Sequence, residues 1–344
     1  MKGSLERMVP EEIVQAIRER SNIVLFTHTH PDGDALGSLL ALASILESIG
    51  KTVFCYLEEP VSHLYDFLPE TERAQTRLEK YRTFRQSAAG DILAIALDCG
   101  DCDRLGENKG EFLKETSFLV IDHHQSHEDF GTARWVDATR SSTGEMVYEL
   151  ALALGAAVDK NCAFNLYVAI CTDTGSFRYE CTSARTMHIV GELLKAGVRP
   201  DTVAGYLYDN YSRERLKLLE MALGSVELSH DGQIAFMHVS QKMLDDSGAS
   251  IEDLEGFINF PRSLKVVKVA ALIKESGSGH VAVSLRAKGQ CNVSEVAKKF
   301  KGGGHRNAAG FRCSGKNVGQ VIEELRTVLA RALENDDHDQ AGHC

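Results

Sequence analysis

The sequence predicts an α/β fold of two domains. The first has a mostly parallel sheet flanked by helices, and the second is a smaller α+β domain. The 344 residues are too many for one ordinary domain and suit two of about 100–200 residues each. In the first half, short apolar runs alternate with longer helical patterns, which is typical of a parallel sheet. Apolar residues make up 43% of the chain and charged residues 25%, so its composition is globular.

Four apolar runs in the first half have the length of buried strands. Because they do not alternate with polar residues, they suit strands that are covered on both faces. We expect these strands at residues 24–26, 52–57, 92–97 and 118–121. Helical patterns lie at 35–48, 144–154, 163–171 and 184–195, and Gly50 and Gly197 follow the first and the last of them, as helix ends favour.

A charged helix over 212–224 precedes a second series of elements. This second series comprises strands at 234–239, 266–273 and 281–285 and helices at 293–300 and 318–333. The run from Ser276 to Gly279 is typical of a hairpin turn. We therefore expect a catalytic domain over 1–205, a connecting helix within 206–228, a substrate-binding domain over 229–334 and a frayed polar tail over 335–344.

Charge and hydropathy exclude several classes of protein. With 38 basic and 49 acidic residues, the net charge of −11 does not fit the broad basic face that long nucleic acids require, although a local positive pocket remains compatible with it. The longest strongly apolar stretch, 35–46, is too short to span a membrane, and the N-terminus has no signal-peptide core. Nine cysteines without a signal sequence suit buried thiols, so we expect a cytoplasmic protein that does not bind membranes.

The segment HTHPDGD at 28–34 places His28, Asp32 and Asp34 directly after the first strand. Two carboxylates and an imidazole this close together require a compensating cation if they all point into the interior. The alternative is turn chemistry, with Pro31 to Asp34 forming a turn and Asp34 capping the following helix.

Three further segments carry acids and imidazoles. Asp98 ends one expected strand, Asp122, His123 and His124 end the next, and Asp173 ends a helical run. Sites in open α/β sheets form at the carboxyl ends of strands, so the four segments together predict one site. Carboxylates mixed with imidazoles suit Mn²⁺ or Mg²⁺ better than structural zinc. There are more candidate ligands than one ion needs, which points to two metals sharing a bridging carboxylate.

Two other motifs have both a chemical and a structural interpretation. Cys99 and Cys102 form one CxxC pair, which is weak evidence for a metal or a redox dithiol, and incidental cysteines are the favoured interpretation. In KGGGHRNAAG at 301–310, glycines would let the backbone approach an anion, and the following side chains would donate to phosphate. The residues concerned are Gly302, Gly303, Gly304, His305 and Arg306, and the alternative is a flexible hairpin tip.

Over nearly its whole length the chain resembles the DHH phosphoesterase family. The matching motifs are HTHPDGDALGS, LDCGDCDRLG, IDHHQSH and CTDTGSFRY, in that order, and GGGHRNAAG is similar to the signature of the DHH-associated C-terminal domain. The two-domain size and the segment TDTGSFRY look most like the NrnA-type group. Those enzymes are cytoplasmic bifunctional oligoribonucleases (nanoRNases) and 3′-phosphoadenosine-5′-phosphate phosphatases.

The resemblance implies a role for each matching residue. His28 and Asp32 would hold one Mn²⁺, while Asp34, His123 and Asp173 would hold the other. Asp98 would bridge the two ions, His124 would lie beside the scissile phosphate, and Asp122 would orient a ligating imidazole. Substrate contacts would come from Arg104, Arg286, His305 and Arg306, with the glycines at 302–304. His30 is left out of the metal set.

The resemblance also implies the reaction, which is hydrolysis of short oligoribonucleotides, including dinucleotides such as pGpG and pApA, to mononucleotides. Conversion of 3′-phosphoadenosine-5′-phosphate to AMP is the expected second activity. A water activated by two metal ions, Mn²⁺ or alternatively Mg²⁺, would attack phosphorus in line within an interdomain cleft. The implied partners are short RNA and a nucleoside 3′,5′-bisphosphate, and a homodimer is compatible. Three alternatives stay open: a cyclic-dinucleotide phosphodiesterase, a manganese inorganic pyrophosphatase and a non-catalytic nucleotide-binding module.

Overall fold

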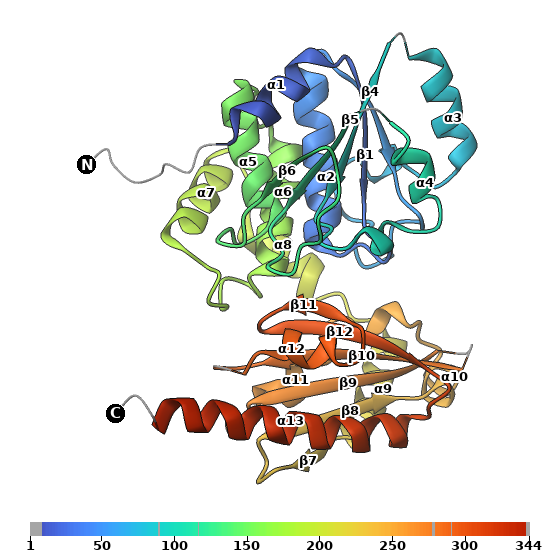
Figure 1. Cartoon of the computed structure of the whole chain (residues 1–344), viewed down its shortest axis with the longest axis vertical. Coiled ribbons are helices and arrows are strands. Elements are labelled where there is room, and N and C mark those ends of the chain that lie inside the picture. Colours follow the sequence, from blue (N-terminus) through green and yellow to red (C-terminus); the bar gives the residue numbers. More distant parts are fainter. Residues whose placement is uncertain (1–8, 89, 116, 277–278, 290, 342–344) are drawn as a thin grey trace. The chain divides into compact units, whose positions relative to one another are not determined.

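The computed structural model describes residues 9–88, 90–115, 117–276, 279–289 and 291–341. The chain forms two compact units, Met1–Asp209 and Asn210–Cys344 (Figure 1). In the described part of the chain, no helix combines the length and the apolar character that crossing a membrane requires.

The first unit is built on a six-stranded sheet in which every pair of neighbouring strands is parallel. Its order is β3-β2-β1-β4-β5-β6, so the chain winds outward in both directions from the adjacent pair β1 and β4. This confirms the predicted α/β class. The strands are β1 (Asn22–Thr27), β2 (Thr52–Tyr56), β3 (Ala74–Gln75), β4 (Ile92–Leu97), β5 (Ser117–Asp122) and β6 (Ala133–Val136).

Helices cover both faces of this sheet, as the continuous apolar strands predicted. Ile23 and Leu25 of β1 pack into one core with residues of α2, α5 and α6, whereas Val24 and Phe26 pack into a second core with residues of α3 and α4 (Figure 1). The helices of the unit are α1 (Glu11–Glu19), α2 (Gly33–Ser48), α3 (Leu78–Ser87), α4 (Lys109–Phe112), α5 (Thr143–Leu154), α6 (Lys160–Asp173), α7 (Ala184–Lys195) and α8 (Pro200–Tyr208), with short 3₁₀ helices η1 (Thr71–Arg73) and η2 (Cys102–Leu105).

The second unit contains a mixed six-stranded sheet of order β11-β12-β10-β9-β8-β7. Its strands are β7 (Glu227–Ser229), β8 (Ile234–Val239), β9 (Val269–Ser276), β10 (His280–Ala287), β11 (Gly303–His305) and β12 (Ala308–Ser314). β8 and β9 are parallel and the other pairs are antiparallel. This architecture confirms the α+β expectation. Of the turn predicted to join β9 and β10, Gly277 and Ser278 lie outside the described residues.

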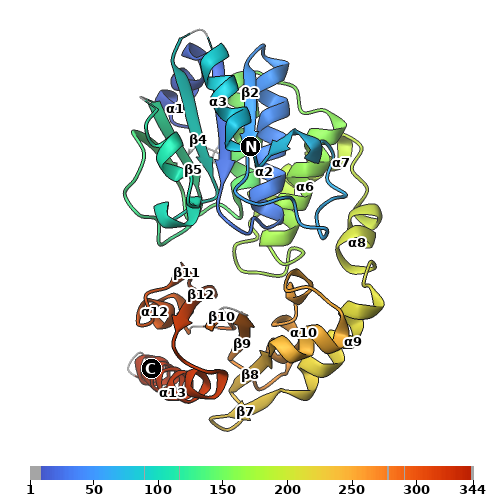
Figure 2. The ribbon, with the colours of Figure 1, turned by 90° about the vertical axis from the view of Figure 1, so that its right-hand side faces the viewer.

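Helices pack on both sides of the second sheet. One core joins the sheet to α12 (Val293–Lys298) and α13 (Val318–Ala341), and the other joins it to residues of α9 (Arg213–Gly224), α10 (Gln241–Ser247) and the segment around η3 (Glu252–Leu254) and α11 (Asn259–Ser263). Figure 2 shows α13 on one side of this sheet and α9 and α10 on the other. The helix expected to connect the domains thus packs its Leu218 and Ala222 into the core of the second unit.

Two segments differ from the sequence-based expectation. α13 continues to Ala341, where a frayed tail was expected from residue 335, because no Gly or Pro interrupts the sequence before Gly342. Residues 303–305 form strand β11, which pairs with β12 in a hairpin that turns at Arg306 and Asn307, so the glycines lie in a strand and not at the hairpin tip. A Cβ atom at Gly302 would lie 2.2 Å from the carbonyl oxygen of Gly310, so only glycine permits the close approach of the two segments.

Candidate metal centre

The site lies where β1 and β4 end side by side. Thr27 pairs with Leu97 at the carboxyl ends of these strands, so His28 and Asp98 follow at the same level. The Nε2 atom of His28 lies 3.6 Å from Oδ2 of Asp98, and both side chains are almost fully buried. This is the point at which the strand order reverses, where ligands bind in open α/β sheets.

Asp98 has an unusual backbone conformation. Its φ of 55° lies in the left-handed region, which Asp tolerates better than most residues. The backbone amide of Asp98 donates to the carbonyl oxygen of Ile121 in the neighbouring strand over 3.0 Å. The strand hydrogen bonding therefore continues up to the residue whose side chain enters the site.

The orientation of His28 suits metal binding through Nε2. Its Nδ1 lies 2.8 Å from the carbonyl oxygen of Thr29. In the tautomer with its hydrogen on Nδ1, this atom donates to that oxygen and the Nε2 lone pair is directed toward Asp98. The guanidinium of Arg104, a candidate substrate contact, lies 3.0 Å from the same Nδ1. The structure thus places Arg104 at the edge of the site.

Asp32 and Asp34 do not have the roles that the turn interpretation assigned to them, in which Asp34 caps the following helix. Asp32, not Asp34, caps α2, because its Oδ1 accepts from the backbone amides of Asp34 and Ala35. The side chain of Asp34 is buried, and it accepts from the amides of Thr143 and Gly144 over 2.7 and 2.9 Å. The suggestion that Asp34 is the helix cap is therefore wrong.

His123 reaches three carboxylates at once. Its Nε2 lies 3.5 Å from Asp98, 3.6 Å from Asp34 and 3.3 Å from Asp173. Its Nδ1 faces the carbonyl oxygen of Arg140 at 3.4 Å, which favours a proton on Nδ1 and makes Nε2 the atom that would bind a metal ion. Asp173 is the last residue of α6, and it is the least buried of the three acids.

One segment, residues 140–144, holds several of these side chains in position; it comprises the end of the loop before α5 and the first two residues of that helix. The carbonyl of Arg140 faces His123, the amides of Thr143 and Gly144 donate to Asp34, and the Thr143 hydroxyl donates to Oδ1 of Asp98 over 3.0 Å. All of these groups are buried. The sequence analysis did not identify this segment, because its contacts come from backbone atoms and a single hydroxyl.

The segment is anchored by a buried arginine. The guanidinium of Arg140 is fully buried and forms ion pairs with Asp137 at 3.0 Å, with Glu149 and, more weakly, with Glu145 at 3.7 Å. Removal of one partner of a buried ion pair is strongly destabilising, because the other charge is left without compensation. The position of the segment therefore depends on this charge network.

Asp122 binds two imidazoles. Its carboxylate lies 2.6 Å from Nδ1 of His124 and 2.7 Å from Nδ1 of His127. We expected it to orient a ligating imidazole, and it faces His124, which belongs to one of the groups of side chains that could hold a metal ion. His123 faces the carbonyl oxygen of Arg140 instead. His127, which the sequence analysis missed, has a buried Nε2 that makes no hydrogen bond with the described residues.

Burial and neighbouring charges shift the pKa values of three carboxylates and one imidazole, those of Asp34, Asp98, Asp173 and His123. Burial, together with Asp98 and Asp173, raises the pKa of Asp34 well above its ordinary value, and burial raises that of Asp173 to about 6. Burial alone would also raise the pKa of Asp98, but the imidazoles of His123 and His28 hold it well below its usual range. Despite burial, the pKa of His123 is raised by Asp173, Asp98 and Asp34. A protonated imidazole therefore offsets part of the negative charge that divalent cations would otherwise neutralise.

Three groups of side chains in the described residues can each hold a metal ion. They are His28 with Asp32 and Asp98, Asp34 with His123 and Asp173, and Asp98 with His123 and His124. Within each group the donor atoms lie within 4.8 Å of one another. The first two groups contain the six ligands predicted from the sequence, and Asp98 connects them by its contact with His123. Oxygen and imidazole donors without thiolates fit a pair of Mn²⁺ or Mg²⁺ ions.

Three residues close to these motifs in sequence have other surroundings. His30 is 64% exposed and pairs with Glu59 at 2.7 Å, consistent with its exclusion from the metal set. Burial raises the pKa of the Cys99 thiol to about 12 and also raises that of Cys102, so neither thiol ionises readily. This supports the interpretation that the pair is incidental.

The candidate substrate residues of the second unit lie on or beside its sheet. Arg286 is in β10 and is half-buried, Gly302 precedes β11, and Gly303 and Gly304 belong to it. Arg306 is exposed between β11 and β12. His305 pairs with Ala308 through its backbone, and its side chain lies outside the described atoms.

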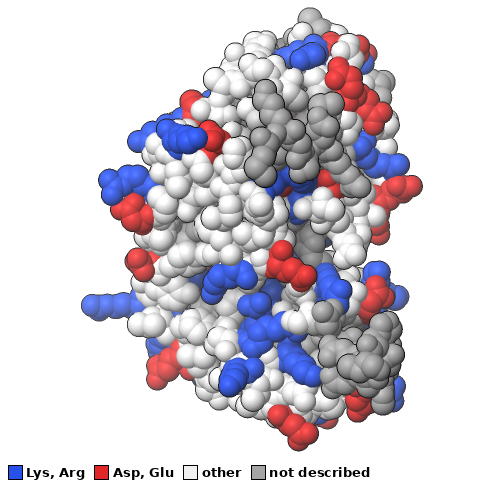
Figure 3. All heavy atoms as spheres, turned by 90° about the vertical axis from the view of Figure 1, so that its left-hand side faces the viewer, with Lys and Arg blue, Asp and Glu red and all other residues white. Residues whose placement is uncertain are grey.

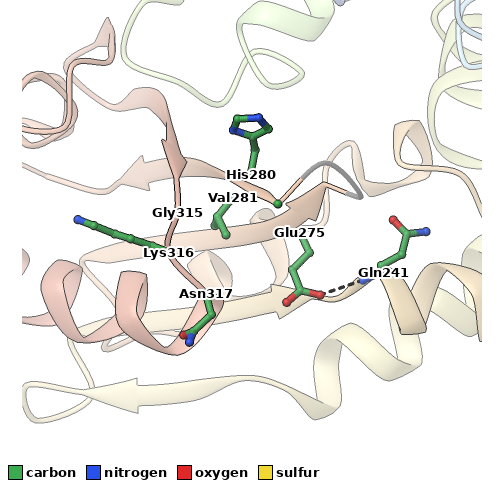
Figure 4. Close-up of a pocket in the computed structure, with 8 residues that line it drawn as sticks. Gln241, Glu275, His280, Val281, Gly315, Lys316 and Asn317 are labelled. Atoms are coloured by element: carbon green, nitrogen blue, oxygen red, sulfur yellow. Dashed lines mark hydrogen bonds between the residues drawn. The ribbon is translucent and has the colours of Figure 1, made fainter.

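The second unit also has an open pocket of about 280 Å³ at the end of the β9–β10 hairpin (Figure 4). Its lining includes Glu275, whose carboxylate accepts from the backbone amide of Gln241 over 3.1 Å, together with His280 and Lys316. None of the three metal-holding groups found among the described residues includes a residue of this pocket. The pocket is therefore separate from the metal centre.

Comparisons with known proteins agree with these observations. The model of the DHH family N-terminal domain matches residues 22–170, and that of the DHHA1 domain matches 232–334. The bifunctional oligoribonuclease and PAP phosphatase NrnA of Thermus thermophilus is 30% identical over 93% of this chain and 94% of its own length. The protein of the same name from Bacillus subtilis is 26% identical over 92% of this chain and 97% of its own.

Solved structures have the same architecture. An exopolyphosphatase-related protein from Bacteroides fragilis superposes with a TM-score of 0.82 at 28% identity, over 94% of this chain and 95% of its own. RecJ from Thermus thermophilus, crystallised with Mn²⁺, reaches a TM-score of 0.53 at 12% identity over 95% of this chain and 55% of its own, which is a likeness of fold. On the extent of these matches, and of the Thermus NrnA match in particular, the chain belongs to the DHH phosphoesterase family, with a DHHA1 domain in its second unit.

Proposed function

We propose that this protein is a manganese-dependent phosphoesterase that hydrolyses short oligoribonucleotides to mononucleotides. We further propose that it converts 3′-phosphoadenosine-5′-phosphate to AMP. The observation that carries the proposal is the pair of ligand groups at the ends of β1 and β4, connected by Asp98. The relatives named as oligoribonuclease and PAP phosphatase, which match along nearly their whole lengths, support the choice of substrates.

In this proposal the six side chains hold two divalent ions. His28 and Asp32 would hold one ion, the group of Asp34, His123 and Asp173 would hold the other, and Asp98, which lies beside both His28 and His123, would be a ligand of both. When bound, such ions lower the pKa of a water molecule between them and stabilise the charge that develops on phosphoryl oxygens. The fixed Nδ1 contacts of His28 and His123 keep each Nε2 directed at the ions.

His124 is the candidate for proton transfer and for contact with the scissile phosphate. Although burial lowers it, the pKa of His124 is raised overall because Asp122 lies beside its Nδ1. The imidazole therefore keeps a proton that it can donate to a phosphoryl oxygen or to the leaving group. Asp122 acts as a positioning residue, since it holds the ring without reaching the reacting atoms.

The second unit would bind the nucleotide part of the substrate. Arg286 and the backbone of residues 302–304 are the candidate contacts, with His305 and Arg306 beyond them. On the face drawn in Figure 3, Lys and Arg side chains gather on the lower, second unit, although the net charge of the chain is −11. Such local clusters are enough for a substrate with few phosphates.

One assay tests the function. The purified full chain with Mn²⁺ is incubated with 5′-labelled RNA of two to about twenty nucleotides, with 3′-phosphoadenosine-5′-phosphate, with cyclic dinucleotides and with pyrophosphate. We expect turnover of the short RNA and the bisphosphate. Exclusive turnover of pyrophosphate or of cyclic dinucleotides would replace the proposal by one of those activities, and binding without turnover would indicate a nucleotide-binding module.

A further inference from the structure

His127 is buried between an acid and an aromatic ring. Its Nδ1 lies 2.7 Å from Oδ2 of Asp122, and its side chain is only 7% exposed. Its imidazole stacks on the ring of Phe130, with the ring centroids 5.1 Å apart and the planes inclined by 21°. Phe130 in turn packs against the core that includes Phe118 and Val120 of β5. The imidazole is therefore held in place from two sides.

The buried carboxylate of Asp122 has one imidazole on each oxygen. Oδ1 lies 2.6 Å from Nδ1 of His124, and Oδ2 lies 2.7 Å from Nδ1 of His127. Because an ionised carboxylate only accepts hydrogen bonds, both imidazoles donate from Nδ1. Two donors on different oxygens restrict rotation of the carboxylate about its Cβ–Cγ bond, which a single donor would not do. His127 thus limits the directions from which Asp122 can hold His124.

The backbone around His127 is attached to the loop after β4. The amide of Glu128 donates to the carbonyl oxygen of Gly100 over 2.7 Å. A Cβ atom at Gly100 would lie 3.0 Å from Cβ of His124 and 3.4 Å from Oδ2 of Asp122, so this loop packs closely on both side chains. The segment that carries His127 is therefore anchored beside the residues on which it would act.

The other ring nitrogen of His127 indicates where the imidazole contributes. Its Nε2 is buried and has no hydrogen-bond partner within the described ranges of the chain. An unpaired buried polar atom is unfavourable, and an apolar ring such as that of Phe would stack on Phe130 without this penalty. The contribution that is specific to the imidazole is therefore the Nδ1 donor to Asp122.

We propose that His127 is a positioning residue for hydrolysis, because it fixes Asp122 and Asp122 in turn fixes His124. This inference rests on the proposed function for the role of His124 at the scissile phosphate. Proton donation in the transition state requires a well-directed imidazole, whereas the six proposed metal ligands include neither His127 nor Asp122. Loss of His127 should therefore lower kcat and leave KM and the metal content unchanged.

Two variants at this position separate the donor from the ring. H127N retains a donor, since the side-chain amide of Asn can occupy the place of Nδ1, whereas H127F retains a ring that stacks on Phe130 and lacks the donor. With pApA and Mn²⁺, H127F should lower kcat by about tenfold or more at unchanged KM and metal content, the usual effect of removing a group that orients another. H127N should retain most of the wild-type kcat. F130L is the matched control, because it removes the stacked ring, leaves the donor and should keep the wild-type kcat.

A double-mutant cycle tests whether His127 acts through Asp122. In a D122N background the carboxylate is already absent, so the addition of H127F should change kcat little further. Effects that multiply in the double variant, or an H127F variant with the wild-type kcat, would overturn the inference. An H127N variant as impaired as H127F would do the same, since the donor would then not be the feature that matters.

A measurement on the metal-free protein separates the inference from the proposed function. In the chelated full chain with isotope-labelled histidine, NMR reports the hydrogen on Nδ1 of His124 directly. H127F should move this resonance, and F130L should leave it near the wild-type position. An unmoved resonance in H127F would refute the inference alone. A moved resonance in a protein whose wild type turns over none of the substrates named above would refute the proposed function and leave the placement of His124 by His127 and Asp122 standing.

Discussion

The hydroxyl of Thr143 donates to Oδ1 of Asp98 across 3.0 Å in the buried interior of the first unit. Without this hydrogen bond, the carboxylate of Asp98 would be freer to rotate between the two ligand groups that it connects. The neighbouring amides of Thr143 and Gly144 hold Asp34 in the same way. One segment thus orients a ligand of each group.

We predict that T143V weakens Mn²⁺ binding about tenfold or more, the usual effect of removing a group that orients a ligand. Isothermal titration calorimetry measures this affinity. T132V is the matched control, because Thr132 bonds the backbone at Phe118, away from the ligand groups. Equal Mn²⁺ affinities in the two variants would show that the Thr143 hydroxyl does not orient Asp98.

We predict that D98N abolishes hydrolysis and loses at least one metal ion per chain, while the fold is retained. Asn is the better probe than Ala because it tolerates the left-handed backbone at this position. Elemental analysis of the purified variant and circular dichroism measure the two effects. Full metal occupancy with near-normal turnover would remove Asp98 from the site.

We predict that D122N lowers kcat by about tenfold to a hundredfold with unchanged metal content. The carboxylate raises the pKa of His124, so its removal should shift the limb of the pH–rate profile that reports this imidazole to lower pH. The profile is recorded with saturating Mn²⁺. A loss of metal instead of a shift in the profile would mean that Asp122 supports the ligands and not His124.

We predict that Asp173 makes the metal-free protein less stable as the pH rises. The pKa of Asp173 is about 6 in the fold against 3.8 for an ordinary Asp, so between these values the native state retains a proton that the unfolded chain has released. Stability therefore falls as the pH increases through this window. The measurement is the Tm of the wild type minus the Tm of D173N, both freed of metal by a chelator. This difference should decrease between about pH 4 and pH 7. A Tm difference that is constant or increases over this range would contradict the assignment.

We predict that oligonucleotides of two to about five residues are cleaved faster than twenty-mers, with a shallow dependence on salt. Each phosphate neutralised by a protein cation adds to the salt dependence, and the candidate cations are few. The measurement is kcat/KM across a length series at two salt concentrations. A rate that rises steadily with length, or internal cuts in long RNA, would exclude the short-substrate proposal.

The first unit was largely predictable because its chemistry follows strand ends. Parallel strands place their carboxyl ends at one edge of the sheet. The acids and imidazoles that follow residues 27, 97 and 121 are therefore expected to lie close together at that edge. The bridging and ligating roles of these residues remain predictions. The imidazoles that Asp122 contacts, His124 and His127, could not be predicted, because the sequence does not show which of several nearby imidazoles a carboxylate faces.

Other parts of the structure could not be read from the sequence. Arg140 looks like a surface residue in a polar loop, yet it is fully buried because Asp137 and Glu149 surround it. Lys274 and Arg312 both pair with Ala282 only through the register of three strands, and register depends on pairing across the whole sheet. Such relationships are properties of tertiary structure and leave no local pattern.

The winding of the first sheet sets the order in which the site can be assembled. Its six candidate ligands extend from His28 to Asp173, and β1 acquires its neighbour β4 only after two intervening strands, β2 and β3. A chain emerging from the ribosome therefore exposes its first ligands long before the last ones exist. Metal ions held by these residues, as proposed, would not nucleate folding of this unit as zinc does in a zinc finger. They would bind only after the long-range strand pairs have closed, so a bound metal would report that the sheet has formed in the correct order.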